Sequence, residues 1–293
     1  MTYGAPRDDD DLPRYLAAVR GGRAPDPSLV AEMRRRYARI GGSPLVRITS
    51  AQAAALEREL GDGWVAAAAM RFSPPSIADG VNALVSRGAT HVVGICMSPQ
   101  WSPTLMGGYE RELAAAAHAA GVTFALAEAW YREPAFVASV TERVREALEA
   151  RDAFVLLTAH SLPRRVFDAE PGYIAQLEET GELVANLAGL RRDRWRWAYQ
   201  SAGHTQEEWL RPDLTELFPW IRESGETDIL VAPVQFLADH LEVLYDLDVA
   251  AAEQARSVGL RYRRIAMPNE TPSFIRALAE VARKTALSTA GAA

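Results

Sequence analysis

The chain has 293 residues, of which 48% are hydrophobic and 24% charged, so disordered and collagen-like classes are excluded. Acidic residues outnumber basic ones by 38 to 32, and this net charge of -6 gives no support to nucleic-acid binding. The one cysteine, Cys96, excludes a disulfide framework and a cysteine-built zinc or iron–sulfur site within one chain. With no signal peptide and no apolar run of the ~20 residues that span a bilayer, we expect a cytoplasmic protein without stable membrane insertion.

Short apolar segments alternate with longer helical patterns. We predict strands at 64–70, 91–95, 123–126, 153–158, 195–199, 229–232 and 262–265. Several are nearly continuous apolar runs, as expected for strands buried on both faces of a parallel sheet. Helices are predicted at 76–86, 108–120, 134–150, 174–187, 238–257 and 273–288. This alternation predicts an α/β fold with two Rossmann-like domains, each a parallel sheet flanked by helices.

We place the domain boundary near residue 150, after a long helix and before the strand at 153–158. Residues 1–150 then form the N-terminal half and residues 151–265 the C-terminal half. The final helix, within 266–293, is expected to pack back on the N-terminal half. An α/β half usually opens with a buried strand, but almost nothing precedes Tyr3. We therefore expect the first strand either to be missing from this chain or to lie upstream of it.

A histidine follows one of the buried strands. Residues 156–163 read LLTAHSLP, so His160 lies where the strand ends. Ligands of open α/β sheets bind at this carboxyl edge. A neutral imidazole there could bind a metal or accept a proton, although a histidine that merely caps the strand would give the same pattern.

Two acidic residues lie on a helix that begins at the same edge. Glu242 and Asp246 are four residues apart and share one helix face. A solvated acidic face is the simpler interpretation, but a carboxylate that meets His160 could hold a divalent metal such as Fe(II). We interpret His240 as a local hydrogen-bonding residue and His204, in a polar loop, as solvated.

Arginines gather near the N-terminus. Arg20 and Arg36 belong to this set, which is followed by the loop Gly41-Gly42-Ser43-Pro44. Arginine clusters are usually solvated, but near a pocket their guanidinium groups bind carboxylates in a bidentate manner and suit an anionic small molecule. The loop is neither a G-x-G-x-x-G motif nor a P-loop, which argues against a nucleotide cofactor.

In this order, the segments resemble the ferrochelatase family, which inserts Fe(II) into a porphyrin late in haem biosynthesis. Residues 158–163 (TAHSLP) look like the family signature S-A-H-[GS]-L-P. Residues 236–246 (FLADHLEVLYD) look like F-x-[SA]-D-H-x-E-x-L-Y-[DE], and residues 200–212 match a third block. The start Tyr3-Gly4-Ala5-Pro6 resembles the coproporphyrin branch. The resemblance implies two chelatase-type domains and insertion of Fe(II) into coproporphyrin III to give Fe-coproporphyrin (coprohaem).

The resemblance also implies roles for single residues. His160 and Glu242 become the catalytic pair that holds the metal, and Asp246 lies on a path for metal or protons. The implied substrate-binding residues are Tyr3, Arg20, Arg36, Tyr37, Ser43 and Tyr109. Fe(II) and coproporphyrin III are substrates, with no prosthetic group and no Fe–S cluster. The resemblance further implies a monomer that makes a transient contact with the downstream haem-pathway enzyme.

The chain departs from the family pattern at two places. Ala250 stands where a third acid of the helical row is expected, and Arg71-Phe72 replaces a Lys-His pair that binds a peripheral metal in some members, so no second metal is expected there. Three alternatives stay open. They are a protoporphyrin IX ferrochelatase, a cobalt or nickel chelatase for a related tetrapyrrole, and a porphyrin or haem carrier with reduced turnover.

Overall fold

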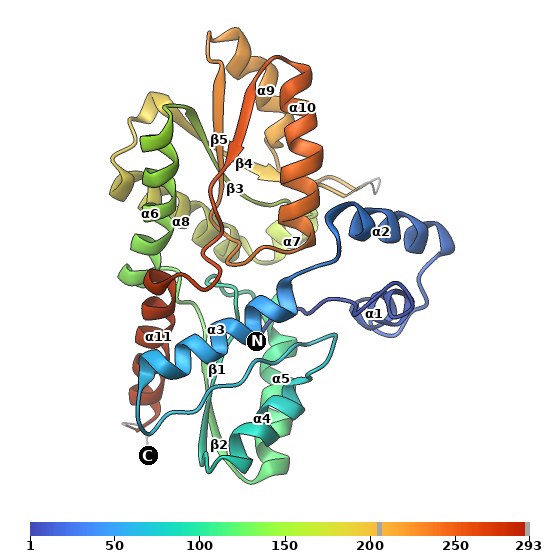
Figure 1. Ribbon diagram of the computed structural model, residues 1–293, viewed down its shortest axis with the longest axis vertical. Coiled ribbons are helices and arrows are strands. Elements are labelled where there is room, and N and C mark those ends of the chain that lie inside the picture. The colour runs from blue at the N-terminus through green and yellow to red at the C-terminus, as the bar shows by residue number, and fades with distance from the viewer. Residues whose placement is uncertain (204–206, 291–293) are drawn as a thin grey trace.

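The computed structural model describes residues 1–203 and 207–290, which form two parallel sheets with helices packed around them (Figure 1). The first sheet pairs β1 (His91–Ile95) with β2 (Thr123–Ala127). The second has the order β4-β3-β5-β6, with β3 (Phe154–His160), β4 (Trp195–Gln200), β5 (Asp228–Pro233) and β6 (Arg261–Arg264). The α-helices are α1 (Leu12–Val19), α2 (Pro27–Ile40), α3 (Leu45–Leu60), α4 (Ile77–Ser86), α5 (Pro103–Ala120), α6 (Pro134–Ala150), α7 (Arg164–Ala169), α8 (Pro171–Ala188), α9 (Leu214–Glu223), α10 (Ala252–Ser257) and α11 (Pro272–Ala290).

The second sheet is buried on both faces, as its apolar strands predict. Alternate residues of β3 and β5 point to opposite sides. Leu157 and Leu230 pack against α6, α8 and α11, whereas Leu156 and Val231 pack against α9, α10 and the π-helix η2 (Glu242–Ala251). All four side chains are fully buried. The sheet therefore forms a rigid layer whose carboxyl edge carries the loops that follow β3 and β5.

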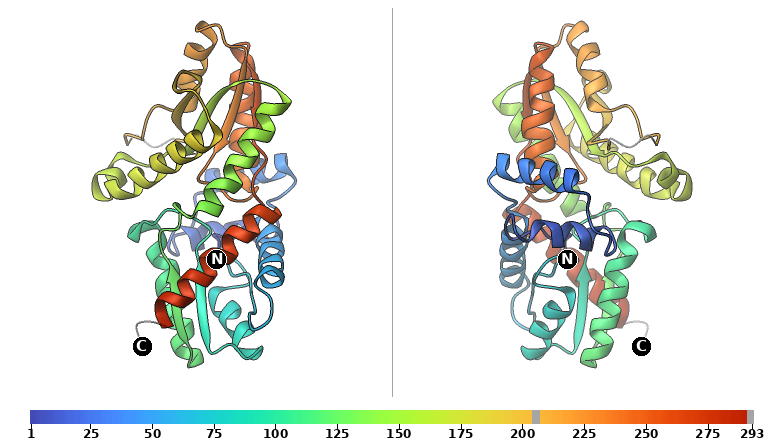
Figure 2. Two further views of the ribbon diagram at one scale, coloured as in Figure 1. Left: turned by 90° about the vertical axis from the view of Figure 1, so that its left-hand side faces the viewer. Right: turned by 90° about the vertical axis from the view of Figure 1, so that its right-hand side faces the viewer.

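The first sheet is covered by α4 and α5 on one face. On its other side, α11 contacts β1, β2 and α3, and it also reaches α6 (Figure 2). The last helix thus joins the two sheets, while the boundary near residue 150 stays a prediction. None of the described helices has both the length and the apolar character needed to cross a bilayer.

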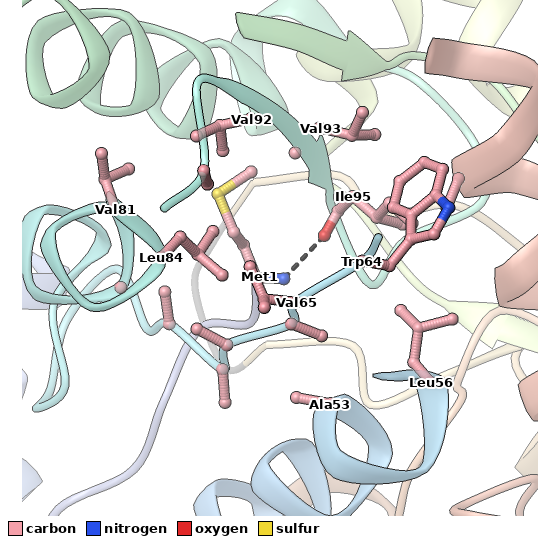
Figure 3. Close-up of a pocket in the computed structure, with 18 of the residues that line it drawn as sticks. Met1, Ala53, Leu56, Trp64, Val65, Val81, Leu84, Val92, Val93 and Ile95 are labelled. Atoms are coloured by element: carbon pink, nitrogen blue, oxygen red, sulfur yellow. Dashed lines mark hydrogen bonds between the residues drawn. The ribbon is translucent and has the colours of Figure 1, made fainter. Parts of the chain in front are cut away.

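The prediction of a strand at 64–70 is wrong. Residues 64–69 are irregular, and Met70 makes only isolated bridges, to Thr2 and Ser76. Apolar composition alone does not make a strand, because a strand also needs a neighbouring strand along its length. Here the space between this segment and β1 is a cavity except at Met1 and Thr2 (Figure 3).

The structure also changes the helical assignments. It contains α1, α2 and α3 before residue 61, where we predicted no helix. The helix predicted at 238–257 begins four residues later, and its first ten residues, Glu242–Ala251, form the π-helix η2 before α10 continues it. The π-helix is rare, and where it occurs it is frequently part of a functional site.

An ion pair at the start of β5 makes stability depend on pH. Arg261 donates hydrogen bonds of 2.9 and 2.5 Å to the Asp228 carboxylate, and Thr227 adds one of 2.8 Å. The hydrogen bonds from Arg261, which have the largest effect, and from Thr227 outweigh burial and hold the pKa of Asp228 well below its ordinary value of 3.8. Because the folded-state pKa is depressed, the stabilisation is present above pH 3.8 and is lost as the pH falls through the folded-state value.

We expect Asp228→Asn to lower the free energy of unfolding by about 1–3 kcal/mol near pH 7, the cost of losing charged hydrogen bonds. Urea unfolding at several pH values measures this difference, which should shrink toward pH 2. The exposed Asp193, paired with Arg191 at 2.6 Å, is the matched control, and Asp193→Asn should have little effect. A difference that is constant over this pH range would contradict the assignment.

Candidate active site

The structure brings His160 and Glu242 together at the carboxyl edge of the second sheet. His160 is the last residue of β3, and Glu242 is the first residue of η2, which follows β5 after a short loop. Because β3 and β5 are parallel neighbours, their carboxyl ends meet at one edge. The distance from His160 Nε2 to Glu242 Oε2 is 3.8 Å. The side chains are 24% and 43% exposed, so both can be reached from solvent.

A second imidazole approaches the same carboxylate. His240 Nε2 lies 3.6 Å from Glu242 Oε2. The Nδ1 atom of His240 lies 2.9 Å from the Ala238 carbonyl oxygen, and His160 Nδ1 lies 2.5 Å from the Ser161 carbonyl oxygen. Since a carbonyl oxygen only accepts hydrogen bonds, Nδ1 carries the proton in both rings. Each ring therefore presents its Nε2 atom to the Glu242 carboxylate.

The sequence predicts only a local hydrogen bond for His240. That bond to Ala238 exists, but the same ring also contacts Glu242. The prediction assumed a helix through both residues, in which a spacing of two would separate their side chains. His240 instead precedes the helix, in a loop that turns it toward Glu242. The D-H-x-E pattern of residues 239–242 was the sequence signal that could have indicated this contact between His240 and Glu242.

The histidines control the charge of Glu242. Burial raises the pKa of Glu242, but the charge of His160 and the hydrogen bond from His240 outweigh it and lower the pKa to about 2. Burial lowers the pKa of His240, but Glu242 outweighs it and raises that pKa above its usual value. Burial, and secondarily the charge of Glu242, raises the pKa of Asp246. The site thus contains one firmly ionised carboxylate and, one turn further along η2, a carboxyl group that takes up protons more readily.

Gln235 fixes the end of β3. Its side-chain oxygen accepts a 2.7 Å hydrogen bond from the His160 backbone N–H, and its amide nitrogen donates to the Tyr173 hydroxyl at 2.9 Å. Gln235 lies in the loop that also leads to Glu242. This bond therefore links the backbones that carry the two site residues, a role that the sequence motifs did not reveal.

Arg36 connects α2 to η2. Its guanidinium group lies 3.3 Å from Asp246 Oδ1, 2.7 Å from Glu32 Oε1 and 5.0 Å from the centre of the Tyr245 ring. The predicted carboxylate-binding arginine thus lies next to the predicted proton path. In the structure it neutralises two protein carboxylates.

A tyrosine-rich cluster in the N-terminal half consists of Tyr3, Arg71, Phe72 and Tyr109. Tyr3 is 46% exposed, and its ring makes an edge-on contact with Phe72 at 4.6 Å between centres. The guanidinium group of Arg71 lies 4.8 Å from the Phe72 ring centre and 5.4 Å from that of Tyr109. Partial burial raises the pKa of Tyr3, Arg71 opposes the rise, and Glu242 adds to it. The phenol of Tyr3 therefore lies within the field of the Glu242 carboxylate.

The remaining predicted substrate-binding residues, Tyr37, Ser43 and Arg20, do not all lie in one place. Tyr37 is buried, and burial followed by the charge of Glu242 raises its pKa. Tyr37 and Ser43 line a cavity of about 470 Å³ together with Arg7 and Arg47. Arg20 is exposed at the end of α1, away from these contacts.

His204 lies outside the residues that the structure describes. Over residues 1–203 and 207–290, no group of three or more His, Cys, Asp or Glu side chains has the arrangement of a metal-binding cluster.

A family model described as Ferrochelatase matches residues 1–286. The chain belongs to the ferrochelatase family. The coproporphyrin III ferrochelatase of Geobacillus thermodenitrificans is 38% identical to it over 97% of this chain and 94% of the relative. The coproporphyrin III ferrochelatase of Bacillus subtilis is 36% identical over 97% and 96%, and the ferrochelatase of Deinococcus radiodurans 35% over 99% and 96%. The predicted family is thereby confirmed, and with it the assignment as a porphyrin-metallating enzyme of this family.

Solved chelatase structures share the fold of this ferrochelatase-family chain. SirB from Bacillus subtilis with Fe³⁺ aligns with a TM-score of 0.61 at 17% identity, over 85% of this chain and 94% of SirB. CbiX, described as the terminal enzyme for siroheme biosynthesis in denitrifying bacteria, aligns with a TM-score of 0.56 at 16% identity, over 82% and 92%. At such identities the likeness concerns the fold alone, and it confirms the predicted α/β chelatase-type architecture.

Proposed function

We propose that the protein inserts Fe(II) into coproporphyrin III and releases Fe-coproporphyrin for haem biosynthesis. Family membership and the coproporphyrin III ferrochelatases among its relatives support this proposal. The single observation that carries it is the ionised Glu242 carboxylate with His160 Nε2 at 3.8 Å and His240 Nε2 at 3.6 Å. Imidazole nitrogen and carboxylate oxygen together suit Fe(II).

Metallation replaces two pyrrole N–H protons with one divalent ion, so the site must supply a metal carrier and a proton acceptor. In the proposed mechanism, Glu242 and His160 bind Fe(II) and release it to the macrocycle. The two protons leave through the same edge. Asp246 is suited to take up each proton in turn, because burial raises its pKa. Transfer to Asp246 and then to solvent restores the site for the next ion.

The macrocycle would lie between Glu242 and the tyrosine-rich cluster. Tyr3 would then face the metal from the side opposite to Glu242 and His160, and Tyr109 would support the same face. Arg20, Arg36, Tyr37 and Ser43 would hold the rim and its carboxylates. A planar porphyrin hides its nitrogen lone pairs in the ring plane, so rim contacts that pucker it at a cost of ~1–5 kcal/mol would expose them to the metal.

The decisive experiment mixes the purified protein anaerobically with Fe(II) and either coproporphyrin III or protoporphyrin IX. Metallation is followed by the change in the absorbance spectrum. Faster insertion into coproporphyrin III supports the proposal. Faster insertion into protoporphyrin IX would replace it with the other ferrochelatase activity, and binding without insertion would replace it with a carrier function.

We further propose that the enzyme is monomeric and cytoplasmic and has no prosthetic group. Its contact with the downstream haem-pathway enzyme is transient. Cys96 is buried, and burial raises the pKa of its thiol to about 11. Such a thiol is a poor ligand for an iron–sulfur cluster, because cluster ligands are thiolates. Light scattering of the purified protein tests the monomer.

Arg36→Ala should weaken porphyrin binding in proportion to the number of carboxylates on the ring, because a guanidinium group binds carboxylates directly. We expect a loss of roughly 10-fold or more in affinity for coproporphyrin III, about one charged hydrogen bond. Fluorescence titration measures this loss, with a neutral porphyrin ester as the reference ligand. Arg39→Ala, an exposed arginine in the last turn of the same helix, is the control. Equal losses for coproporphyrin III and the ester would contradict the assignment.

A further inference from the structure

A single asparagine outside the site holds the loop that carries His240. Asn269 lies in the segment between β6 and α11. Its backbone N–H donates a 3.0 Å hydrogen bond to the Leu237 carbonyl oxygen. Its side-chain oxygen accepts a 2.9 Å bond from the Asp239 N–H, and its side-chain amide donates a 2.8 Å bond to Asp239 Oδ2. These bonds fix the loop on both sides of Ala238, immediately before His240.

The fixed segment determines where the His240 ring lies. The ring contacts two neighbours within the loop, the Ala238 carbonyl oxygen at 2.9 Å from Nδ1 and the Phe236 ring at 4.6 Å between centres. With these contacts made, Nε2 lies 3.6 Å from Glu242 Oε2. The His240 carbonyl oxygen accepts a 2.8 Å bond from the Leu244 N–H, so η2 holds the residue on one side. On its other side the ring position depends on the loop that Asn269 holds.

Asparagine meets two demands at position 269. The backbone has a φ of 45°, in the left-handed region that asparagine, aspartate and glycine adopt more readily than other residues. The side-chain carboxamide is both a donor and an acceptor, as the carboxylate and the N–H of Asp239 require. Glycine would meet only the first demand. Aspartate would place a second carboxylate against that of Asp239.

Helix α3 anchors this asparagine from the other side. Gln52 of α3 is only 3% exposed, and its side-chain amide donates a 2.8 Å hydrogen bond to the Asn269 carbonyl oxygen. Leu45 and Ile48 of the same helix pack against Ala238. The loop before His240 is therefore held against a helix by both polar and apolar contacts.

The carboxylate of Asp239 also joins this loop to the helix of Glu242. Arg264 donates a 3.2 Å hydrogen bond to Asp239 Oδ1, and it binds the Asp248 carboxylate of η2 at 2.7 and 2.8 Å. The Arg264 side chain is 12% exposed. Asn269 and Arg264 thus hold the two oxygens of one carboxylate, and together they set the loop relative to η2.

We propose that Asn269 is a positioning residue for iron insertion, which holds loop 237–240 so that His240 Nε2 stays beside the Glu242 carboxylate. The inference rests on the proposed function, because it gives His240 a part in handling the metal with Glu242. Two groups receive one ion together only where their separation is fixed by surrounding contacts. The hydrogen bonds of Asn269 in the described part of the chain go to the loop and to α3, and not to the residues proposed to hold the porphyrin rim.

Asn269→Gly removes the carboxamide but keeps the left-handed backbone accessible, so it tests the side-chain hydrogen bonds. We expect kcat/KM for Fe(II) to fall about 10- to 100-fold, the usual effect of a small misplacement near the reacting groups. Affinity for coproporphyrin III should stay within about 2-fold of the wild type, because the rim contacts are untouched. Asn186→Gly, at an exposed asparagine near the end of α8, is the matched control and should change neither quantity. Equal losses for Fe(II) and coproporphyrin III, or an equal loss in the control, would overturn the inference.

A paired exchange separates positioning from a general loss of stability. Asn269→Asp alone sets two carboxylates against each other and should lower kcat/KM for Fe(II) at least as much as Asn269→Gly. Adding Asp239→Asn restores one amide and one carboxylate with their places exchanged. The double variant should recover to within about 3-fold of the wild type, since the hydrogen bonds form again. Failure to recover would overturn the inference, and the same comparison carries the test if Asn269→Gly does not fold.

A readout that needs no turnover distinguishes this inference from the proposed function. The nuclear Overhauser effect between the His240 and Phe236 rings reports the ring position at a fixed pH. We expect it to fall to about half or less in Asn269→Gly and to return in the double variant, because the loop is then held again. An unchanged effect in Asn269→Gly would overturn the positioning of His240. Absence of metallation by the wild type would overturn the proposed function instead, and the ring contact would still test the positioning.

Discussion

His160→Ala is expected to abolish iron insertion while porphyrin binding stays measurable. The imidazole presents Nε2 to the Glu242 carboxylate at 3.8 Å, so its loss removes a nitrogen ligand and a proton acceptor from the place where the metal must be released. We expect kcat/KM for metallation to fall by about 10²–10⁴-fold, the usual contribution of such a group. Stopped-flow absorbance under anaerobic conditions measures the rate, and fluorescence quenching measures porphyrin binding.

His118→Ala is the matched control, because His118 is an exposed histidine on α5, away from the site. It should leave both rate and binding unchanged. Wild-type turnover in His160→Ala would refute the assignment of His160. Loss of porphyrin binding with the rate at saturation unchanged would reassign His160 from metal handling to substrate binding.

Glu242→Gln is expected to have an effect of similar size, about 10²–10⁴-fold on kcat/KM, because the amide keeps the shape of the side chain but cannot bind Fe(II) as an anion. The variant also tests the charge network directly. Glu242 raises the pKa of His240, so that pKa should fall in Glu242→Gln. Imidazole resonances followed by NMR against pH report this change whether or not the variant is active.

The sign of the pH effect follows from the depressed pKa of Glu242. Its carboxylate is ionised in the folded protein far below pH 4.5, so any stabilisation by the histidines is present above that value and is lost as the pH falls through about 2. Iron insertion should therefore not lose activity between pH 7 and 5 through protonation of Glu242. Glu253→Gln, an exposed acid on α10, is the control. An unchanged His240 pKa in Glu242→Gln would refute the network.

Much of the fold followed from local patterns. The continuous apolar runs at β3 and β5 predicted strands buried on both faces, and Leu156 and Leu230 are fully buried. Such runs are informative because parallel strands leave no face to solvent. The N-terminal helices α1–α3 were not predicted. The segment 64–70 was assigned to a strand although its backbone meets no neighbouring strand, since composition records burial but not pairing.

In the candidate active site, too, some features were predictable from the sequence and others were set by packing. The position of His160 after a strand, and the spacing of Glu242 and Asp246, depend on backbone geometry that sequence periodicity encodes directly. The approach of His240 to Glu242 does not, because it depends on a loop whose course is set by its packing. The pairing of Arg36 with Asp246 joins residues 210 positions apart, and no local pattern predicts such a contact.

The family, the α/β class and the residue types that meet at the sheet edge were predictable, because motif order, strand composition and helix spacing are local properties of the sequence. Which side chains share an electric field depends instead on the tertiary structure. It placed Tyr3 near Glu242, brought the Nε2 atoms of two imidazoles to one carboxylate, and opened a cavity beside β1. These features depend on distances between segments far apart in the chain, which only packing sets.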